Sequence, residues 1–147
     1  MKKNSILLVE DNEGDILLTR EALENGSFTG NIDVVRNGHE AVDYFNQILS
    51  TPGIPFPDLI FLDINLPKMN GQEVLQFVKG HPSLKHIPVV VLTTSSSEQD
   101  VFIAYQNGAN CCITKPVDLN LFMEIIEKTE NFWFQIVNMP TLKQLKK

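Results

Sequence analysis

The sequence has few of the features that mark an extracellular or membrane-bound protein. Only two of its 147 residues are cysteine, Cys111 and Cys112. As neighbours on a predicted strand they point to opposite faces of a sheet, which suits neither a shared metal nor an ordinary disulfide. The apolar run after Lys2 and Lys3 is too short for a signal peptide, and no run approaches the length of a bilayer span. We therefore expect a protein of the reducing cytoplasm without a membrane partner.

Positive charge is scarce as well. The chain has 12 Lys and Arg against 18 Asp and Glu, so its formal net charge is -6 and its pI is near 5.0. Because nucleic-acid backbones bind to surfaces rich in Lys and Arg, this balance argues against a nucleic-acid partner. The three histidines, His39, His81 and His86, lack the spacing typical of a transition-metal site.

Five short apolar runs alternate with stretches of helical periodicity. The runs are 6–9, 32–35, 59–62, 89–92 and 111–113, and the helical stretches are 15–25, 38–49, 72–79, 98–107 and a last one from Asp118. Such alternation is typical of a parallel sheet with right-handed crossovers. The sequence therefore predicts one α/β domain, a doubly wound five-stranded parallel sheet with helices on both faces.

Polar residues follow the ends of these predicted strands. Glu10 and Asp11 follow the first run, Asp63 the third, Thr93 and Thr94 the fourth, and Lys115 and Pro116 the fifth. The carboxyl ends of parallel strands share one edge of the sheet, where open α/β sheets bind ligands. Taken singly, Asp63 could be a turn residue, Lys115 a surface lysine and the threonines ordinary strand formers. Their convergence predicts a site.

Three carboxylates at one edge require positive charge. Two of them about 4 Å apart repel by about 4 kcal/mol at an effective dielectric constant near 20, so a bound cation or a raised pKa must compensate. Mg²⁺ prefers oxygen ligands and keeps several waters, which suits one or two carboxylates, a loop carbonyl and a phosphoryl oxygen. We expect Mg²⁺ as the cofactor, with Mn²⁺ as its substitute.

In chain order, these residues resemble the receiver domain of two-component response regulators. The resemblance rests on Val9-Glu10-Asp11, on residues 62–71, on Leu92-Thr93 and on Thr114-Lys115-Pro116. It extends from about Ser5 to about Glu127, nearly the whole chain. It implies a flavodoxin-like sheet with the strand order 2-1-3-4-5 and a place in phosphorelay signalling.

The resemblance also implies the roles of the acidic residues. Asp63 would accept a phosphoryl group from a sensor histidine kinase, and Asp11 and Asp63 would bind magnesium directly. Glu10 would bind it through water, and the backbone carbonyl of Asn65 would complete the protein ligands. The Asn65 side chain lies at a family position that tunes dephosphorylation.

The same resemblance assigns the residues around the phosphoryl group. Thr93 and Lys115 would contact it, and Thr94 and Ser95 would modulate its hydrolysis and the switch that follows. The peptide bond between Lys115 and Pro116 would be cis, as in the family.

The sequence departs from the family at the switch. Relatives have an aromatic residue three positions before the lysine, where this chain has Cys112. We expect Cys112 to be a small buried filler. Tyr105 or its neighbours in the fourth helix would then carry the surface change that follows phosphorylation.

The last helix carries an apolar stripe longer than a receiver core requires. We therefore divide the chain into a receiver domain, residues 1–130, and a C-terminal helix extension with a tail, residues 131–147, and expect no output domain. The segment 132–140 resembles the tail of stand-alone regulators that pair with bacterial and cyanobacterial phytochrome kinases. Phe132, Trp133, Phe134 and Ile136 would form a homodimer interface through the face made by the fourth helix, fifth strand and fifth helix. The alternative is packing of this segment within the chain.

Three other functions fit the fold less well. A metal-dependent aspartyl phosphatase needs a second acid two positions after its nucleophile, where this chain has Asn65. A flavin or nucleotide module would offer glycines and backbone amides to phosphate in the first loop, but residues 10–13 are Glu-Asp-Asn-Glu. A pseudo-receiver that only binds partners stays an alternative, although every site residue is present.

Overall fold

Strands and helices alternate along the chain in the computed structural model, which describes residues 4–66, 69–94 and 97–140. The elements are β1 (Asn4–Val9), α1 (Glu13–Asn25), β2 (Gly30–Val35), α2 (Gly38–Ser50), β3 (Leu59–Asp63), α3 (Gly71–Gly80), β4 (Val89–Thr93), α4 (Glu98–Gln106), β5 (Cys111–Thr114), α5 (Leu119–Asn131) and the short π-helix η1 (Phe132–Ile136). Each predicted strand and helix is present and begins within two residues of its predicted start. The short helix η1 was not predicted.

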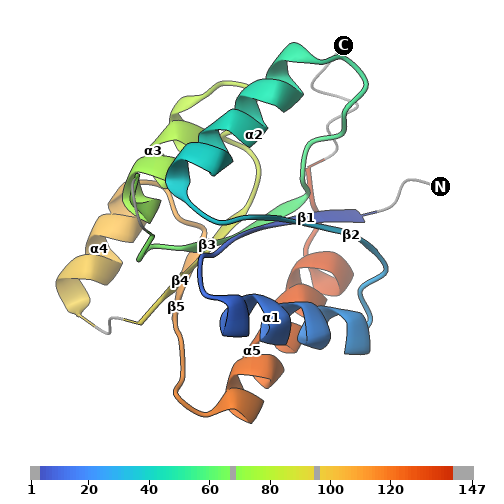
Figure 1. Cartoon of the computed structure of the whole chain (residues 1–147), viewed down its shortest axis with the longest axis vertical. Coiled ribbons are helices and arrows are strands. Elements are labelled where there is room, and N and C mark those ends of the chain that lie inside the picture. Colours follow the sequence, from blue (N-terminus) through green and yellow to red (C-terminus); the bar gives the residue numbers. More distant parts are fainter. Residues whose placement is uncertain (1–3, 67–68, 95–96, 141–147) are drawn as a thin grey trace.

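The strands form one parallel sheet in the order β2-β1-β3-β4-β5. Helices α1 and α5 cover one face of this sheet, and α2, α3 and α4 cover the other (Figure 1). The predicted strand order and the two helical layers are therefore confirmed. Among the described residues, no helix combines the length and apolar character that a bilayer crossing needs.

The core consists of two apolar clusters, one on each face of the sheet. Alternate residues of β3 enter different clusters: Ile60 and Leu62 pack under α2 and α3, and Leu59 and Phe61 pack under α1 and α5. Every residue of β3 and β4 is buried, as expected for central strands of a parallel sheet. The core thus surrounds the central strands on both faces, and Asp63 and Thr93 at their carboxyl ends are buried with them.

Capping side chains fix the starts of the helices that follow the strands. The side chains of Asn12, Asn37, Asn70, Ser97 and Asp118 each accept a backbone hydrogen bond in the first turn of the next helix. The Asn12 cap makes α1 start at Glu13, two residues earlier than the periodicity predicts. The first turn of α1 therefore lies directly beside the carboxyl end of β1.

The C-terminal helix does not continue as the sequence predicts. α5 ends at Asn131, and the next five residues form η1. Trp133 and Phe134 pack partly against the cluster under α1 and α5, and the rings of Phe28 and Phe134 are 5.5 Å apart. An apolar stripe predicts which side chains face the core, but it does not distinguish an α-helical turn from a π-helical one.

The expectation of a cis peptide before Pro116 is not met. The described residues contain no cis peptide bond, so the bond between Lys115 and Pro116 is trans. Bonds before proline favour trans by about 0.5–1 kcal/mol unless the surroundings impose cis. With the trans bond, the backbone N–H of Lys115 donates to the carbonyl of Thr93 at 2.7 Å, and the side chain reaches the end of β3.

Candidate functional site

Asp63 is the last residue of β3 and lies at the carboxyl edge of the sheet, 4% exposed. Its Oδ1 accepts a hydrogen bond from the backbone N–H of Asn65 at 2.8 Å. Gly71 lies close to the end of β3, because its N–H donates to the carbonyl of Ile64 and a Cβ at Gly71 would lie 2.5 Å from the Asp63 carbonyl oxygen. The backbone of the loop after β3 thus supplies one hydrogen bond to the Asp63 carboxylate.

Glu10, Asp11 and Asp63 form an acidic cluster. One carboxylate oxygen from each lies within 4.8 Å of the other two, so the three could share a metal ion. Glu10 is 1% exposed, and its Oε2 accepts from the backbone N–H of Asn12, whereas Asp11 is exposed. The donor set is entirely oxygen, which fits Mg²⁺ or Mn²⁺ and not a softer metal.

Lys115 reaches into this cluster from the end of β5. Its Nζ donates to Glu10 Oε1 at 2.6 Å, to Asp15 Oδ2 at 2.9 Å and to Asp63 Oδ2 at 3.1 Å. Burial by itself lowers the pKa of the Lys115 ammonium, but the bonds to Glu10 and Asp15 outweigh it and hold the pKa above its ordinary value. Lys115 is thus a fixed positive charge beside Asp63.

The carboxyl group of Glu10 has a raised pKa because it is buried and lies next to the carboxylate of Asp63. Burial, followed by its contact with Asp63, raises the pKa of Glu10 to about 8, and Lys115 offsets only part of this. A divalent cation at the cluster would supply the missing positive charge. The electrostatics therefore favour cation binding.

Asp15 is the site residue that sequence reasoning missed. It lies in the first turn of α1, and its carboxylate bonds to Lys115 from a half-buried position. The available signal was an acidic residue four positions after Asp11, in a helix that starts directly after a strand end. The periodicity places the helix start at residue 15, which makes Asp15 an ordinary first helical residue and gives no reason to place its carboxylate in the site.

The hydroxyl groups at the end of β4 lie beside the loop after Asp63. Thr93 is 2% exposed, and its Oγ1 lies 3.4 Å from Asn65 Oδ1. The hydroxyl oxygen of Thr94 lies 3.3 Å from the same amide oxygen. These long contacts bring Thr93, Thr94 and Asn65 together. Ser95, the remaining residue predicted here, lies outside the described residues.

Two of the predicted switch residues, Tyr105 and Cys112, are in contact with each other. The hydroxyl of Tyr105 accepts a hydrogen bond from the backbone N–H of Cys112 at 3.1 Å. Cys112 packs partly against the core under α2 and α3, and burial raises the pKa of its thiol. A thiol with a raised pKa is a poor nucleophile, which is consistent with a packing role for Cys112.

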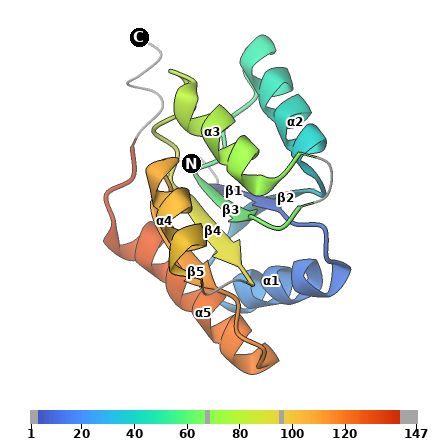
Figure 2. The same ribbon diagram turned by 90° about the vertical axis from the view of Figure 1, so that its left-hand side faces the viewer.

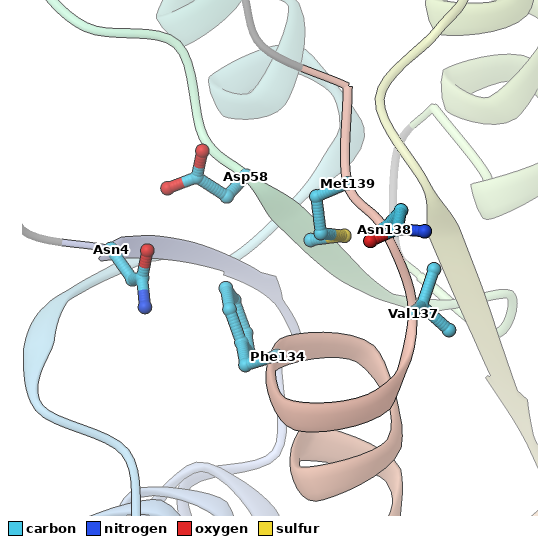
Figure 3. A pocket seen from close by; sticks show the side chains of 6 residues that line it. All are labelled: Asn4, Asp58, Phe134, Val137, Asn138 and Met139. Carbon is cyan, nitrogen blue, oxygen red and sulfur yellow. The ribbon is translucent and has the colours of Figure 1, made fainter.

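A cavity at the other end of the sheet is not part of this site. A cavity of about 290 Å³ lies between the amino ends of β1 and β3 and the residues around η1, lined by Asn4, Asp58, Phe134, Val137, Asn138 and Met139 (Figure 3). Asp58 immediately precedes β3 and Asp63 ends it, so this cavity and the acidic cluster lie at opposite ends of the strand. The acidic cluster is the chemically distinctive part of the described structure.

The comparison with protein families identifies this arrangement. Residues 6–127 match the model of the response regulator receiver domain. The chain belongs to this family. The strand order, the two acids after β1, the aspartate ending β3 and the lysine after β5 are thus parts of a two-component receiver domain with a flavodoxin-like fold.

Relatives of this receiver domain include phytochrome response regulators. It is 41% identical over 135 residues to the response regulator Rcp1 of Synechocystis sp. (strain ATCC 27184 / PCC 6803 / Kazusa), covering 92% of each chain. The crystal structure of the phosphorylated cyanobacterial phytochrome response regulator RcpA is 44% identical, with a TM-score of 0.89 over 95% of this chain and 100% of that one. The Mn²⁺-bound form of Rcp1 is 40% identical, with a TM-score of 0.86 over 94% of this chain and 99% of that one.

Proposed function

We propose that this receiver domain accepts a phosphoryl group on Asp63 from the phosphohistidine of a sensor kinase and passes the signal on through its surface. The observation that carries the proposal is the contact of the buried Asp63 carboxylate with Lys115 and with the acids after β1. A buried aspartate that only capped a turn would not need this set of charges. The localisation we propose is the cytoplasm.

The chain's own residues define the mechanism. A carboxylate oxygen of Asp63 attacks the phosphorus in line, a P–O bond forms, and the P–N bond to the kinase histidine breaks. Lys115 balances charge on the transferring group, and the Thr93 hydroxyl donates to one of its oxygens. Glu10, Asp11, Asp63 and the Asn65 carbonyl would hold Mg²⁺ or Mn²⁺, which supplies further positive charge at the phosphoryl oxygens.

The same site argues against a phosphatase acting on foreign substrates. A general acid would have to protonate the leaving group near Asp63. The side chain two positions on is Asn65, whose amide oxygen lies 3.3 to 3.4 Å from the hydroxyls of Thr93 and Thr94. We therefore propose a phosphoacceptor with self-phosphorylation and self-dephosphorylation chemistry, not an enzyme with its own turnover.

A phytochrome-type histidine kinase is the partner that the relatives favour. RcpA is described as a cyanobacterial phytochrome response regulator, and the similarity to it covers 95% of this chain, including residues beyond the family match at 6–127. We propose residues 1–130 as the receiver domain and 131–147 as a C-terminal helix extension and tail. The stimulus would then be light sensed by the kinase.

A homodimer is the assembly that the surface favours. Helix α4, strand β5 and helix α5 form one side of the molecule (Figure 2). That side has a groove of about 560 Å³ lined by Cys111, Ile113, Phe132 and Trp133 among others, and exposed apolar side chains such as Ile136, 69% exposed, follow it. A twofold interface uses the same patch on both copies, and exposed apolar surface commonly marks an association site, so a second copy is the occupant we propose.

Labelling with a small phosphodonor tests the phosphoacceptor function. The wild-type chain should incorporate phosphate in the presence of Mg²⁺, and Asp63→Asn should abolish it. Asp58→Asn is the matched control, because Asp58 immediately precedes the same strand and accepts a hydrogen bond from Ser5. Absence of labelling in the wild type, or labelling that survives in Asp63→Asn, would favour the pseudo-receiver instead.

A further inference from the structure

All three N–H donors of the Lys115 ammonium are used in hydrogen bonds. An ammonium group has three N–H donors. In this structure they are directed to three carboxylates, Glu10, Asp15 and Asp63, at 2.6, 2.9 and 3.1 Å. Contact with a phosphoryl oxygen therefore requires Lys115 to give up one of these bonds.

The three carboxylates differ in how much their energy would rise if Lys115 moved away. The side chains of Glu10 and Asp63 are 1% and 5% exposed, whereas that of Asp15 is 29% exposed. A buried carboxylate that loses its cation has no water to replace it, but a partly exposed one does. Glu10 and Asp63 also belong to the acidic cluster that could share a metal, and Asp15 does not. Asp15 is the partner that Lys115 can release at least cost.

The position of Asp15 in α1 supports its release. Its backbone N–H donates to Asn12 Oδ1 at 2.9 Å, so the first turn stays fixed whether or not the carboxylate holds Lys115. A carboxylate near a helix N-terminus is stabilised by the helix dipole and by water. The Asp15 carboxylate therefore keeps favourable surroundings after Lys115 moves.

We propose that Asp15 is a positioning residue that restrains Lys115 in the unphosphorylated domain and opposes formation of the phosphorylated state. The inference rests on the proposed function, because the contact that Lys115 gains is with a phosphoryl group on Asp63. Asp15 opposes phosphorylation in two ways: it competes for the ammonium, and its negative charge repels the phosphoryl oxygens. Its carboxylate thus sets how readily the domain is phosphorylated.

The test compares Asp15→Asn with Glu13→Gln. Glu13 lies in the same first turn, but its carboxylate bonds to Arg36 at 2.8 Å and not to Lys115. Each variant removes one negative charge from the N-terminus of α1. The two measurements are the affinity for beryllofluoride, an anionic phosphoryl mimic, at saturating Mg²⁺, and the affinity for Mg²⁺ alone by calorimetry.

We expect Asp15→Asn to bind beryllofluoride about three- to tenfold more tightly than the wild type, as the loss of one partly exposed charge-assisted bond predicts. Its affinity for Mg²⁺ should be unchanged or lower, since a nearby negative charge is gone. Glu13→Gln should change either affinity by less than about twofold. Tighter binding of the anion without tighter binding of the cation separates restraint of Lys115 from simple damage to the site, which would weaken the binding of both.

Two results would overturn the inference in distinguishable ways. If the wild type binds beryllofluoride and is labelled on Asp63, but Asp15→Asn binds the mimic equally or more weakly, Asp15 does not restrain Lys115 and the phosphoacceptor function stands. If the wild type neither binds the mimic nor is labelled, the proposed function fails and the role of Asp15 fails with it.

Discussion

At the level of single residues, the site depends on one lysine that separates like charges. Lys115 contacts two almost fully buried carboxylates, those of Glu10 and Asp63. Removing one partner of a buried ion pair leaves an uncompensated charge and costs about 3 kcal/mol or more. A metal ion at the acidic cluster would supply positive charge to the same carboxylates. The lysine and the metal are therefore partly interchangeable for stability, though not for phosphoryl transfer.

Lys115→Met should accordingly be destabilised by about 3 kcal/mol without divalent cations. Adding Mg²⁺ should then raise its free energy of unfolding by more than it raises that of the wild type. Denaturant unfolding with and without Mg²⁺ measures both effects. Lys128→Met is the control, because that side chain is 75% exposed and should change stability by less than about 0.5 kcal/mol. An equal effect of Mg²⁺ on Lys115→Met and the wild type would contradict the prediction.

Lys79 is a half-buried lysine, and it should make stability depend on pH. Its Nζ donates to the carbonyls of Lys85 and Ile87 and to Asn110 Oδ1, and burial lowers the pKa of Lys79 to about 8. Between pH 8 and the ordinary lysine pKa of 10.5, the unfolded chain holds more protons at this position than the folded one. The contribution of Lys79 to the free energy of unfolding therefore rises with pH through that interval and is constant on either side of it.

The change should be on the order of 1 kcal/mol, because Lys79 is partly solvated and its three acceptors favour the charged form. Subtracting the unfolding curve of Lys79→Met from that of the wild type at each pH isolates it from the other titrating groups. Lys85→Met, which removes an exposed lysine from the same region, should show the wild-type pH dependence. If the difference in free energy of unfolding between the wild type and Lys79→Met does not change from pH 8 to 10.5, the hydrogen-bond acceptors around Lys79 cancel the effect of burial on its pKa.

At the level of helices and strands, the contact between α4 and β5 is the place to look for a switch. β5 is an edge strand, and the Tyr105 hydroxyl accepts from the N–H of Cys112 on that strand. If phosphorylation draws Thr93 toward Asp63, the adjoining end of β4 and the start of α4 must adjust. Beryllofluoride should then change the amide exchange of α4 and of Cys112.

Tyr105→Phe should speed hydrogen exchange of the Cys112 amide by about fivefold, because it removes one hydrogen bond worth about 1 kcal/mol. Labelling of Asp63 should continue in this variant. The substitution should also reduce the effect of beryllofluoride on the Cys112 amide. Hydrogen exchange followed residue by residue measures both. Phe102→Leu is the control, because Phe102 lies on the same helix and its side chain is 62% exposed. No effect of the mimic on α4 in the wild type would exclude this route.

The sequence could predict the strands and the edge where the site lies, because buried strands are recognised by their apolar runs and parallel topology places their ends together. Asp63, Glu10 and Lys115 follow from that reasoning alone. Asp15 could not be placed, since a shift of two residues in the start of a helix decides which side chains face the strand end. The trans bond before Pro116 depends on small energy differences that the surrounding packing decides.

At the level of the whole molecule, the C-terminal extension divides into a part that packs inward and a part that stays exposed. Trp133 and Phe134 pack partly against the core under α1 and α5, whereas Phe132 and Ile136 are 48% and 69% exposed. Both expected uses of the extension, intramolecular packing and an interface, therefore have their own residues. Phe132 and Ile136 are the more exposed pair, so we expect them to contribute most to a contact with another copy of the chain.

Replacing the exposed pair should weaken the proposed dimer without unfolding the monomer. Phe132→Ser with Ile136→Ser should raise the dimer dissociation constant at least about tenfold and change the free energy of unfolding of the monomer by less than about 1 kcal/mol. Trp133→Ala should instead destabilise the monomer by about 2 kcal/mol, because it removes a half-buried ring. Sedimentation velocity at micromolar concentration, with and without beryllofluoride, together with denaturant unfolding, separates the two effects. A wild-type chain that sediments as a monomer in both conditions, or a double variant that dimerises as the wild type does, would leave the extension with its packing role alone.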